Sequence, residues 1–223
     1  MNSYNICFTE DQVYSLWSYI NLLSKWNKSK RIIGKISEIE VITDLILDSV
    51  LPVIWIRDEV CLVDIGSGGG IPAIPLKIFL PNLNLFMVEP VGKKVSFLKE
   101  AIRGLGLRGV TIYKGRVEEV SHELSAVGAE IAISRAVGRP PSLIKTLQKC
   151  GLHFRHLICY LGGKSSKVSF FGENLGPFAL KDRLEYLIPS GKRRCLILLQ
   201  DMCYSESNNS GPFQTDEEKC RLA

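Results

Sequence analysis

The glycine-rich stretch at residues 61–76 constrains the fold of this chain more than any other feature. It reads CLVDIGSGGGIPAIPL, an apolar run that ends in Asp64 and is followed by four glycines within five residues. Glycine accepts positive φ angles and lets a ligand approach the backbone closely. Open parallel sheets bind ligands at turns of this kind, at the carboxyl ends of their strands. The stretch therefore predicts an α/β fold with a ligand site at this turn.

The chain after residue 60 alternates short apolar runs with helical segments. We expect strands at 61–65, 84–89, 110–113, 130–134 and 156–161, and helices at 71–80, 93–105 and 140–150. Strand, helix and strand in series predict a parallel sheet with helices on both faces. Two later runs, RLEYLIP and RRCLILLQ, are joined by the short link SGK and are expected to pair antiparallel.

The N-terminal segment is predicted to be helical. Thr9 and Gln12 have the spacing of a capping box at its start. Five apolar residues then recur at helical spacing and are expected to pack on the core: Val13, Leu16, Trp17, Ile20 and Leu23. A second amphipathic helix is predicted from Glu38 to Leu51, with Pro52 as its stop.

Composition and pattern together suggest three parts and a soluble protein. We expect an N-terminal helical extension at 1–55, the ligand-binding α/β domain at 56–201 and a disordered polar tail at 202–223. No apolar run reaches the length of a membrane span, and the N-terminus lacks a signal-peptide pattern. A cytoplasmic location and no membrane partner are therefore expected. The net charge of +5 permits an anionic partner without requiring one.

One group of residues has a spacing that zinc could use. Cys150, His153, His156 and Cys159 recur every three residues. The first falls at the end of a predicted helix and the last two fall in a predicted strand, so the four side chains should diverge. We expect no metal site here. The seven cysteines form no CxxC pair, which also argues against a disulfide framework in a reducing compartment.

The spacing of the glycines favours one ligand class. Asp64, Gly66, Gly68 and Gly70 follow D-x-G-x-G-x-G, the pattern with which seven-stranded methyltransferases bind S-adenosylmethionine (SAM). The dinucleotide pattern G-x-G-x-x-G would need a third glycine where this chain has Ile71, so that class is a distant alternative.

Two later loops would complete the site. Glu89 stands nineteen residues after Gly70, where a carboxylate can accept hydrogen bonds from both ribose hydroxyls. Both ligand classes share this acidic residue. In the loop after the third strand, Val117 and Glu118 are candidates for the adenine end.

The chain resembles the RsmG (GidB) family of bacterial methyltransferases. The resemblance rests on Asp64 to Leu76 and on the stretches GKKVSFLKE, GRVEE and ISRAV. It implies a Rossmann-like, seven-stranded SAM-dependent methyltransferase sheet with an N-terminal helical extension, and methyl transfer to N7 of a guanine in 16S ribosomal RNA. Gly66 and Ile71 would contact SAM, Val117 and Glu118 would line the adenine end, and Arg135 would reach the cofactor or the base.

Guanine N7 carries an in-plane lone pair and no proton, so its methylation needs no general base. We therefore expect no catalytic side chain, and expect RNA contacts from Arg135, Arg139 and Lys164. The partner would be 16S rRNA or the small-subunit particle, not DNA, and the protein a monomer.

Three departures from the family pattern leave an alternative open. The usual Asn-Leu-Thr is Arg31-Ile32-Ile33 here, a usual His is Leu45, and the Lys after the fifth strand is shifted to Lys164. A diverged SAM-binding module, or a small-molecule methyltransferase without rRNA activity, is the alternative reading.

Overall fold

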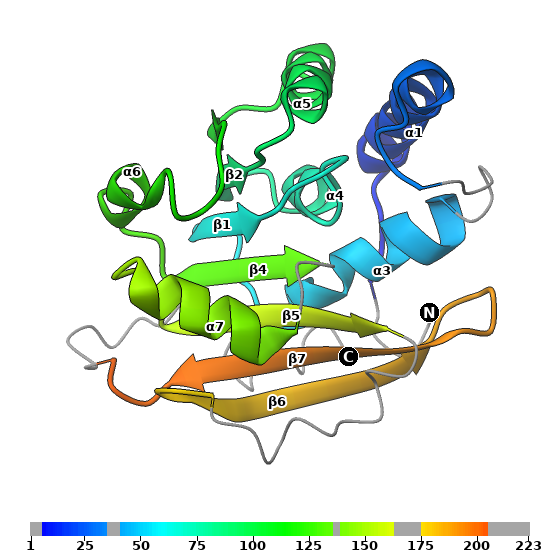
Figure 1. The fold of residues 1–223 in the computed structure, drawn as a ribbon. Coiled ribbons are helices and arrows are strands. Elements are labelled where there is room, and N and C mark those ends of the chain that lie inside the picture. Colours follow the sequence, from blue (N-terminus) through cyan, green and yellow to red (C-terminus); the bar gives the residue numbers. More distant parts are fainter. Residues whose placement is uncertain (1–5, 35–40, 136–138, 163–174, 205–223) are drawn as a thin grey trace.

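The chain forms one twisted sheet whose order is β3-β2-β1-β4-β5-β7-β6 (Figure 1). The computed structural model describes residues 6–34, 41–135, 139–162 and 175–204, with side chains omitted at 41–43. The strands are β1 (Cys61–Ile65), β2 (Asn84–Val88), β3 (Val110–Tyr113), β4 (Ile131–Arg135), β5 (His156–Gly162), β6 (Phe178–Leu187) and β7 (Arg193–Asp201). β7 pairs antiparallel with both β5 and β6, and the remaining pairs are parallel. The predicted α/β methyltransferase sheet and its antiparallel pair are confirmed.

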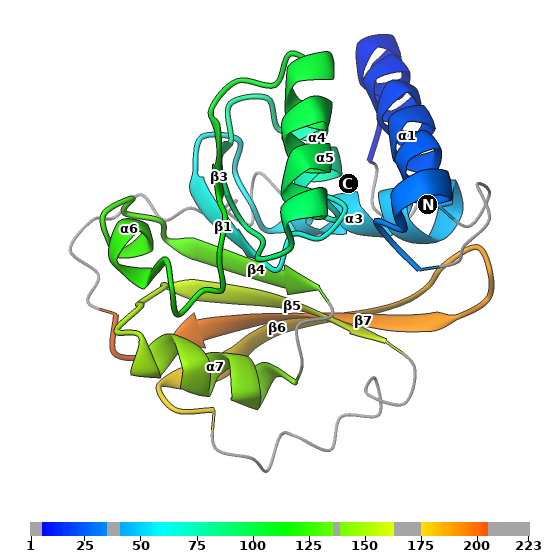
Figure 2. The same ribbon diagram turned by 45° about the horizontal axis from the view of Figure 1, so that its top comes forward.

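Helices cover both faces of the sheet (Figures 1 and 2). The helices are α1 (Glu10–Lys30), α4 (Ala73–Phe79), α5 (Gly92–Gly104), α6 (Ser121–Ser125) and α7 (Pro140–Lys149). Between α1 and β1, a continuous helical segment comprises a π-helical stretch (Val41–Ile46), α3 (Leu47–Val50) and a 3-10 turn (Leu51–Ile54). In the described part of the chain, no helix combines the length and apolar character needed to cross a membrane.

Two apolar cores lie on opposite faces of the sheet, because side chains alternate along each strand. In β1, Leu62 belongs to the core beneath α1, α4 and α5, whereas Val63 and Ile65 belong to the core beneath α6 and α7. The first core also holds Leu23 of α1 and Trp55, the residue directly after the 3-10 turn. The N-terminal helices therefore share one core with the sheet.

The outward face of α1 differs from the prediction. The capping box of Thr9 and Gln12 is present, and Leu16, Ile20 and Leu23 are buried. Val13 and Trp17, which were expected to pack on the core, are 55% and 53% exposed. The buried face consists of Leu16, Tyr19, Ile20 and Leu23, and it is the side of α1 that packs against α4 and α5.

Several predicted boundaries shift for local reasons. The helical segment does not stop at Pro52 but continues to Ile54, because Pro52 occupies the first turn of a 3-10 helix, where its missing N–H is not required. β6 begins at Phe178, before the predicted start at residue 183, and a bulge between Leu180 and Asp182 interrupts its alternation. Of the tail predicted at 202–223, residues 205–223 lie outside the described residues, as does the start of the second predicted helix.

Candidate cofactor and substrate site

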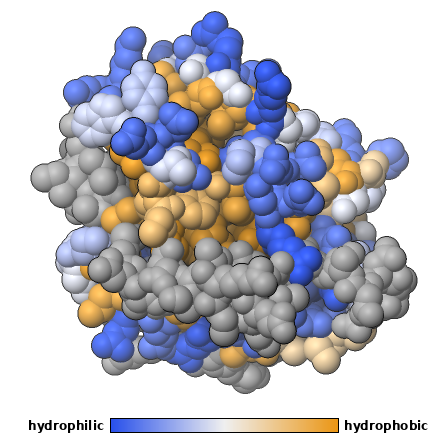
Figure 3. Space-filling view, turned by 180° about the vertical axis from the view of Figure 1, so that it is seen from behind, coloured by the Kyte–Doolittle hydropathy of each residue, from blue (hydrophilic) through white to orange (hydrophobic). Residues whose placement is uncertain are grey.

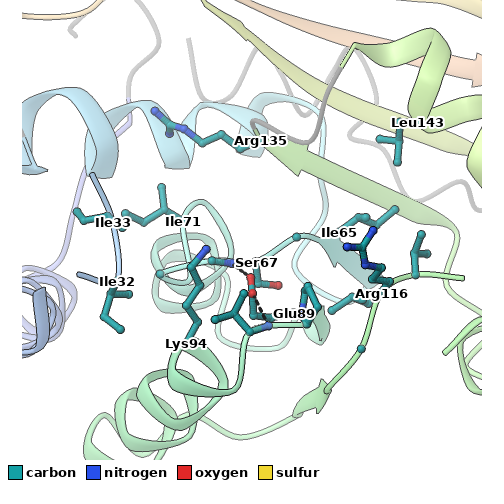
Figure 4. Close-up of a pocket in the computed structure, with 18 of the residues that line it drawn as sticks. Ile32, Ile33, Ile65, Ser67, Ile71, Glu89, Lys94, Arg116, Arg135 and Leu143 are labelled. Carbon is teal, nitrogen blue, oxygen red and sulfur yellow. Dashed lines mark hydrogen bonds between the residues drawn. The ribbon is translucent and has the colours of Figure 1, made fainter. Parts of the chain in front are cut away.

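A cavity of about 1050 Å³ opens at the edge of the sheet where β1, β2 and β4 end (Figure 4). Its walls come from the loops after β1, β2 and β3, from Arg135 at the end of β4, from α5 and α7, and from the segment after α1. Seen from behind, the molecule has a hollow with apolar side chains at its centre and hydrophilic side chains above it and to its right (Figure 3). Ligand sites of open α/β sheets lie at this edge.

The glycine turn after β1 forms the floor of the cavity. Its backbone is anchored to β2, because the N–H groups of Gly66 and Ser67 donate to the carbonyl oxygen of Val88 at 2.9 and 3.0 Å. Gly68 has a φ of +58°, and a Cβ built there would meet no atom nearer than 3.8 Å. The bare backbone at Gly68 therefore faces open space, and a side chain would project into that space.

Two residues of the predicted glycine pattern, Asp64 and Gly70, lie behind this floor and do not line the cavity. A Cβ on Gly70 would lie 2.5 Å from the side chain of Ile74, so the glycine permits close packing against α4. Asp64 is 1% exposed, and its burial raises the pKa of the carboxyl to about 7. The charge of Glu89 adds to this rise, whereas hydrogen bonding with Ser67 opposes it. Direct contact of Asp64 and Gly70 with a ligand does not follow from this geometry.

Glu89 joins the first two loops. Its Oε2 accepts a hydrogen bond from Gly68 N at 2.7 Å, and its Oε1 accepts one from Val91 N at 2.9 Å. The side chain is buried yet lines the cavity. Each carboxylate oxygen has a further lone pair. Glu89 can thus hold the glycine turn in shape and still accept hydrogen bonds from a ligand.

The loop after β3 supplies the third wall. Val117 is buried and Glu118 is exposed, and both line the cavity. Glu119 turns back to the chain, where its carboxylate accepts a hydrogen bond from Arg116 N at 2.8 Å. Leu143 on α7 lies on the same side of the cavity as Arg116 (Figure 4). This side can receive a flat apolar ring with a polar edge.

Arg135 at the end of β4 forms the opposite side, above Ile33 and Ile71 (Figure 4). Its Nη2 lies 2.8 Å from Asp48 Oδ2, and its guanidinium lies over the ring of Tyr160 at 5.2 Å. Its Nη1 is buried and has no hydrogen-bond partner among the described residues. A buried donor without a partner costs free energy. Binding of a molecule that places an acceptor atom beside Nη1 is therefore favoured.

Asp48 is held by a second partner from the far end of the chain. The hydroxyl of Tyr186 donates to Asp48 Oδ1, and the hydroxyl of Tyr160 donates to the carbonyl of Ser49 at 3.1 Å. Burial raises the pKa of Asp48, while Arg135 and the Tyr186 hydrogen bond act in the other direction. This polar cluster links α3, β4, β5 and β6.

The segment after α1 contributes a wall that sequence reasoning missed. Arg31, Ile32, Ile33 and Gly34 line the cavity. The hydroxyl of Tyr19 in α1 donates to the carbonyl of Gly69, and a Cβ on Gly69 would lie 2.8 Å from Ile33 Cγ2. The signal in the sequence was the altered family motif at 31–33, but only the fold shows that these residues face the glycine turn.

Other lining residues missed from the sequence are Lys94 of α5 and Ser142, Leu143 and Thr146 of α7. Lys94 stands in the stretch GKKVSFLKE, and the α7 residues lie in the first two turns of the helix that follows β4. Their positions at the carboxyl edge of the sheet could have suggested them.

The three residues predicted to contact RNA do not lie together. Arg135 lies in the cavity, whereas Arg139 is exposed and precedes α7. Lys164 lies outside the described residues. In the described ranges, no three Cys, His, Asp or Glu side chains are grouped to hold a metal ion, and Cys159 is buried in the core.

Comparison with known proteins agrees with this architecture. A protein-family model described as "GidB: rRNA small subunit methyltransferase G" matches residues 12–169. "Ribosomal RNA small subunit methyltransferase G" of Desulfotalea psychrophila is 31% identical over 192 residues, which cover 83% of this chain and 88% of that protein. The protein of the same name from Alkaliphilus metalliredigens is 34% identical over 131 residues, covering 57% of this chain but only 55% of that protein.

A solved structure shows the same fold at low sequence identity. It is that of a putative rRNA methylase from Clostridium thermocellum, which superposes with a TM-score of 0.52 at 16% identity, over 71% of this chain and 96% of that chain. At this identity the likeness concerns the fold alone. Family membership rests on the sequence matches, one of which spans more than half of the chain and another 88% of a relative. The chain belongs to the GidB family, whose model is described as rRNA small subunit methyltransferase G.

Proposed function

We propose that this chain uses SAM to methylate N7 of a guanine in 16S ribosomal RNA. Membership of the GidB family supports rRNA methylation, and the name of its relatives specifies the small ribosomal subunit. The choice of N7 follows from the resemblance carried by the glycine, GKK and SRA motifs. The proposal includes a cytoplasmic location, a monomer, and 16S rRNA or the small-subunit particle as partner.

The residues of the cavity fit SAM. The bare backbone at Gly68 leaves room for the amino-acid part of the cofactor. Glu89 retains lone pairs for two ribose hydroxyls while it accepts from Gly68 and Val91. Val117 and Leu143 offer apolar surface for a ring on the far side. When bound, SAM supplies an electrophilic methyl group on a sulfonium centre.

The protein's own contribution would be positioning and exclusion of water. Guanine N7 needs no deprotonation, so alignment of the acceptor with the methyl donor carries most of the catalysis. Arg135, held by Asp48, can donate from Nη1 to an acceptor atom of the base or of the cofactor. Ile33 and Ile71 lie below that guanidinium and can keep water from the reacting atoms (Figure 4).

The observation that carries the proposal is the open space above Gly68 next to the Glu89 carboxylate. Two measurements test it. Isothermal calorimetry should detect binding of SAM and none of NAD, and preference for NAD would reject the cofactor. Mapping of N7-methylguanine in 16S rRNA should show one modified position that disappears when the gene is deleted and returns on complementation. An unchanged methylation pattern would favour the diverged binding module or small-molecule enzyme instead.

A further inference from the structure

The outward face of α1 carries aromatic and cationic side chains in one line that ends at the cavity. We define the α1 stripe as Tyr14, Trp17, Asn21, Lys25 and Lys28 of α1 together with Arg31, the residue that caps its C-terminus; successive residues are three or four apart and all are exposed. Residues at this spacing lie on one side of a helix. At 1.5 Å per residue the stripe is about 25 Å long.

The stripe has two chemically different halves. Tyr14 and Trp17 form its first half and are 74% and 53% exposed, which is unusual for aromatic side chains of this size. The second half is cationic, and from residue 12 to residue 34 the sequence contains no Asp or Glu and four Lys or Arg. A positive potential along this part of the helix therefore has no acidic neighbour in sequence to offset it.

The stripe has a fixed position relative to the glycine turn, because α1 is bonded to that turn and packs against α5. Arg31, its last residue, is also part of the cavity wall. The Tyr19 hydroxyl donates to the carbonyl of Gly69, and Lys93 Nζ donates to the carbonyl of Lys30 at 2.7 Å. Trp26 contacts Phe97 of α5 edge to face, and the two helices run side by side (Figure 2). Anything bound along the stripe is thereby held at a fixed distance from the cavity.

We propose that the α1 stripe docks a single-stranded segment of the RNA substrate and delivers the adjoining guanine to the cavity. This inference rests on the proposed function. Aromatic faces exposed beside cations are how proteins hold unpaired bases and their phosphates. A protein partner fits less well, because lysine is depleted at protein–protein interfaces while it fills the second half of this stripe. The RNA backbone would follow Lys25, Lys28 and Arg31, and unpaired bases would stack on Trp17 and Tyr14.

The test measures RNA binding and SAM binding separately. The probe is unmethylated 16S rRNA transcribed in vitro, and the variants are Trp17→Ala, Tyr14→Ala and the double variant Lys25→Gln/Lys28→Gln. Trp17→Ala should raise the RNA Kd about tenfold, in the range seen for loss of one base–aromatic stack. The double variant should make the negative slope of log K against log salt shallower by about 1.4. SAM binding and thermal stability should stay unchanged in all three.

Two matched controls replace exposed residues elsewhere. Lys149→Gln removes an exposed lysine from the last turn of α7, and Leu187→Ala removes an apolar side chain that is 66% exposed. Both should bind RNA like the wild type. Wild-type RNA affinity in the three stripe variants would overturn the docking proposal, as would a Trp17→Ala variant whose only effect is to dissociate a dimer.

The outcomes also separate the inference from the proposed function. If the stripe variants still methylate RNA and bind it with wild-type affinity, RNA docking on the α1 stripe is rejected. The proposed methyltransferase function is then unaffected. If the wild type binds RNA more tightly than the stripe variants but methylates no guanine, RNA docking on the α1 stripe is supported. The proposed methyltransferase function is then rejected.

Discussion

Arg135 and Asp48 form a buried ion pair, with 2.8 Å between Nη2 and Oδ2, that joins the end of β4 to the N-terminal helical segment. The side chains are 14% and 1% exposed, so water screens the pair little. Tyr186 donates to the other oxygen of Asp48. The guanidinium that faces the cavity is therefore oriented by a residue 87 positions earlier in the chain.

Asp48→Asn tests this arrangement. Asn keeps the shape and an acceptor for Tyr186 but leaves the Arg135 charge without its buried partner. Losing one member of such a pair costs about 3 kcal/mol of unfolding free energy, which urea denaturation would measure. We expect kcat/KM for methyl transfer to fall while the Kd for SAM changes little. Glu100→Gln, which removes an exposed ion pair with Arg103, should leave stability and activity unchanged. Full activity in Asp48→Asn would show that the pair does not orient Arg135.

Gly68→Val should abolish SAM binding and leave the protein folded. Valine would occupy the space above the turn and would require a β-branched residue at φ +58°, where such residues are strongly disfavoured. Gly106→Val is the matched control, because Gly106 has φ +63° and no atom near its Cβ position. Both variants should lose similar stability by circular dichroism melting, but only Gly68→Val should lose the calorimetric SAM signal. Retained binding in Gly68→Val would place the cofactor elsewhere.

Tyr19→Phe removes the hydrogen bond that ties α1 to the glycine turn. The hydroxyl is fully buried, and its loss leaves the carbonyl of Gly69 without that donor. We expect a loss of about 1–3 kcal/mol in the free energy of unfolding, together with weaker SAM binding because the turn is less constrained. Tyr14→Phe removes an exposed hydroxyl from the same helix and should change neither quantity. Equal effects of the two substitutions would contradict a specific role for Tyr19.

Asp64→Asn should change the pH dependence of stability. Burial raises the pKa of Asp64 from 3.8 to about 7, so between these values the folded protein binds a proton that the unfolded chain has released. The wild type therefore loses stability from this group as pH rises from about 4 to about 7, and the asparagine variant does not. The free energy of unfolding of Asp64→Asn relative to wild type should increase across this range in urea titrations. A pH-independent difference would mean that Asp64 titrates normally.

Local patterns predicted most of the elements. The alternation of apolar runs and helices placed all five parallel strands of the first part of the sheet within a residue or so, because buried strands and amphipathic helices have distinct periodicities. The Thr9 capping box and the antiparallel pairing of β6 with β7 depend on neighbouring residues only, and both are present. Boundaries that depend on bulges or on 3-10 turns, as at Leu180 and Pro52, were not predictable in this way.

The candidate site was only partly visible in the sequence. Gly66, Ile71, Glu89, Val117, Glu118 and Arg135 all line the cavity. Gly70 and Asp64 belong to the same motif but lie behind its floor, one against α4 and the other beneath the turn. A sequence motif therefore includes residues that pack the turn against the rest of the protein as well as residues that line the site.

By itself, the sequence determined the sheet, the glycine turn and the acidic residue that follows the second strand, since each depends on short-range periodicity or on a fixed offset. Only the tertiary structure decided that the segment at 31–34 closes the cavity, that Asp48 orients Arg135, and that Trp17 faces outward. These relationships join residues far apart in the chain, and they follow from how α1 and α3 pack against the sheet.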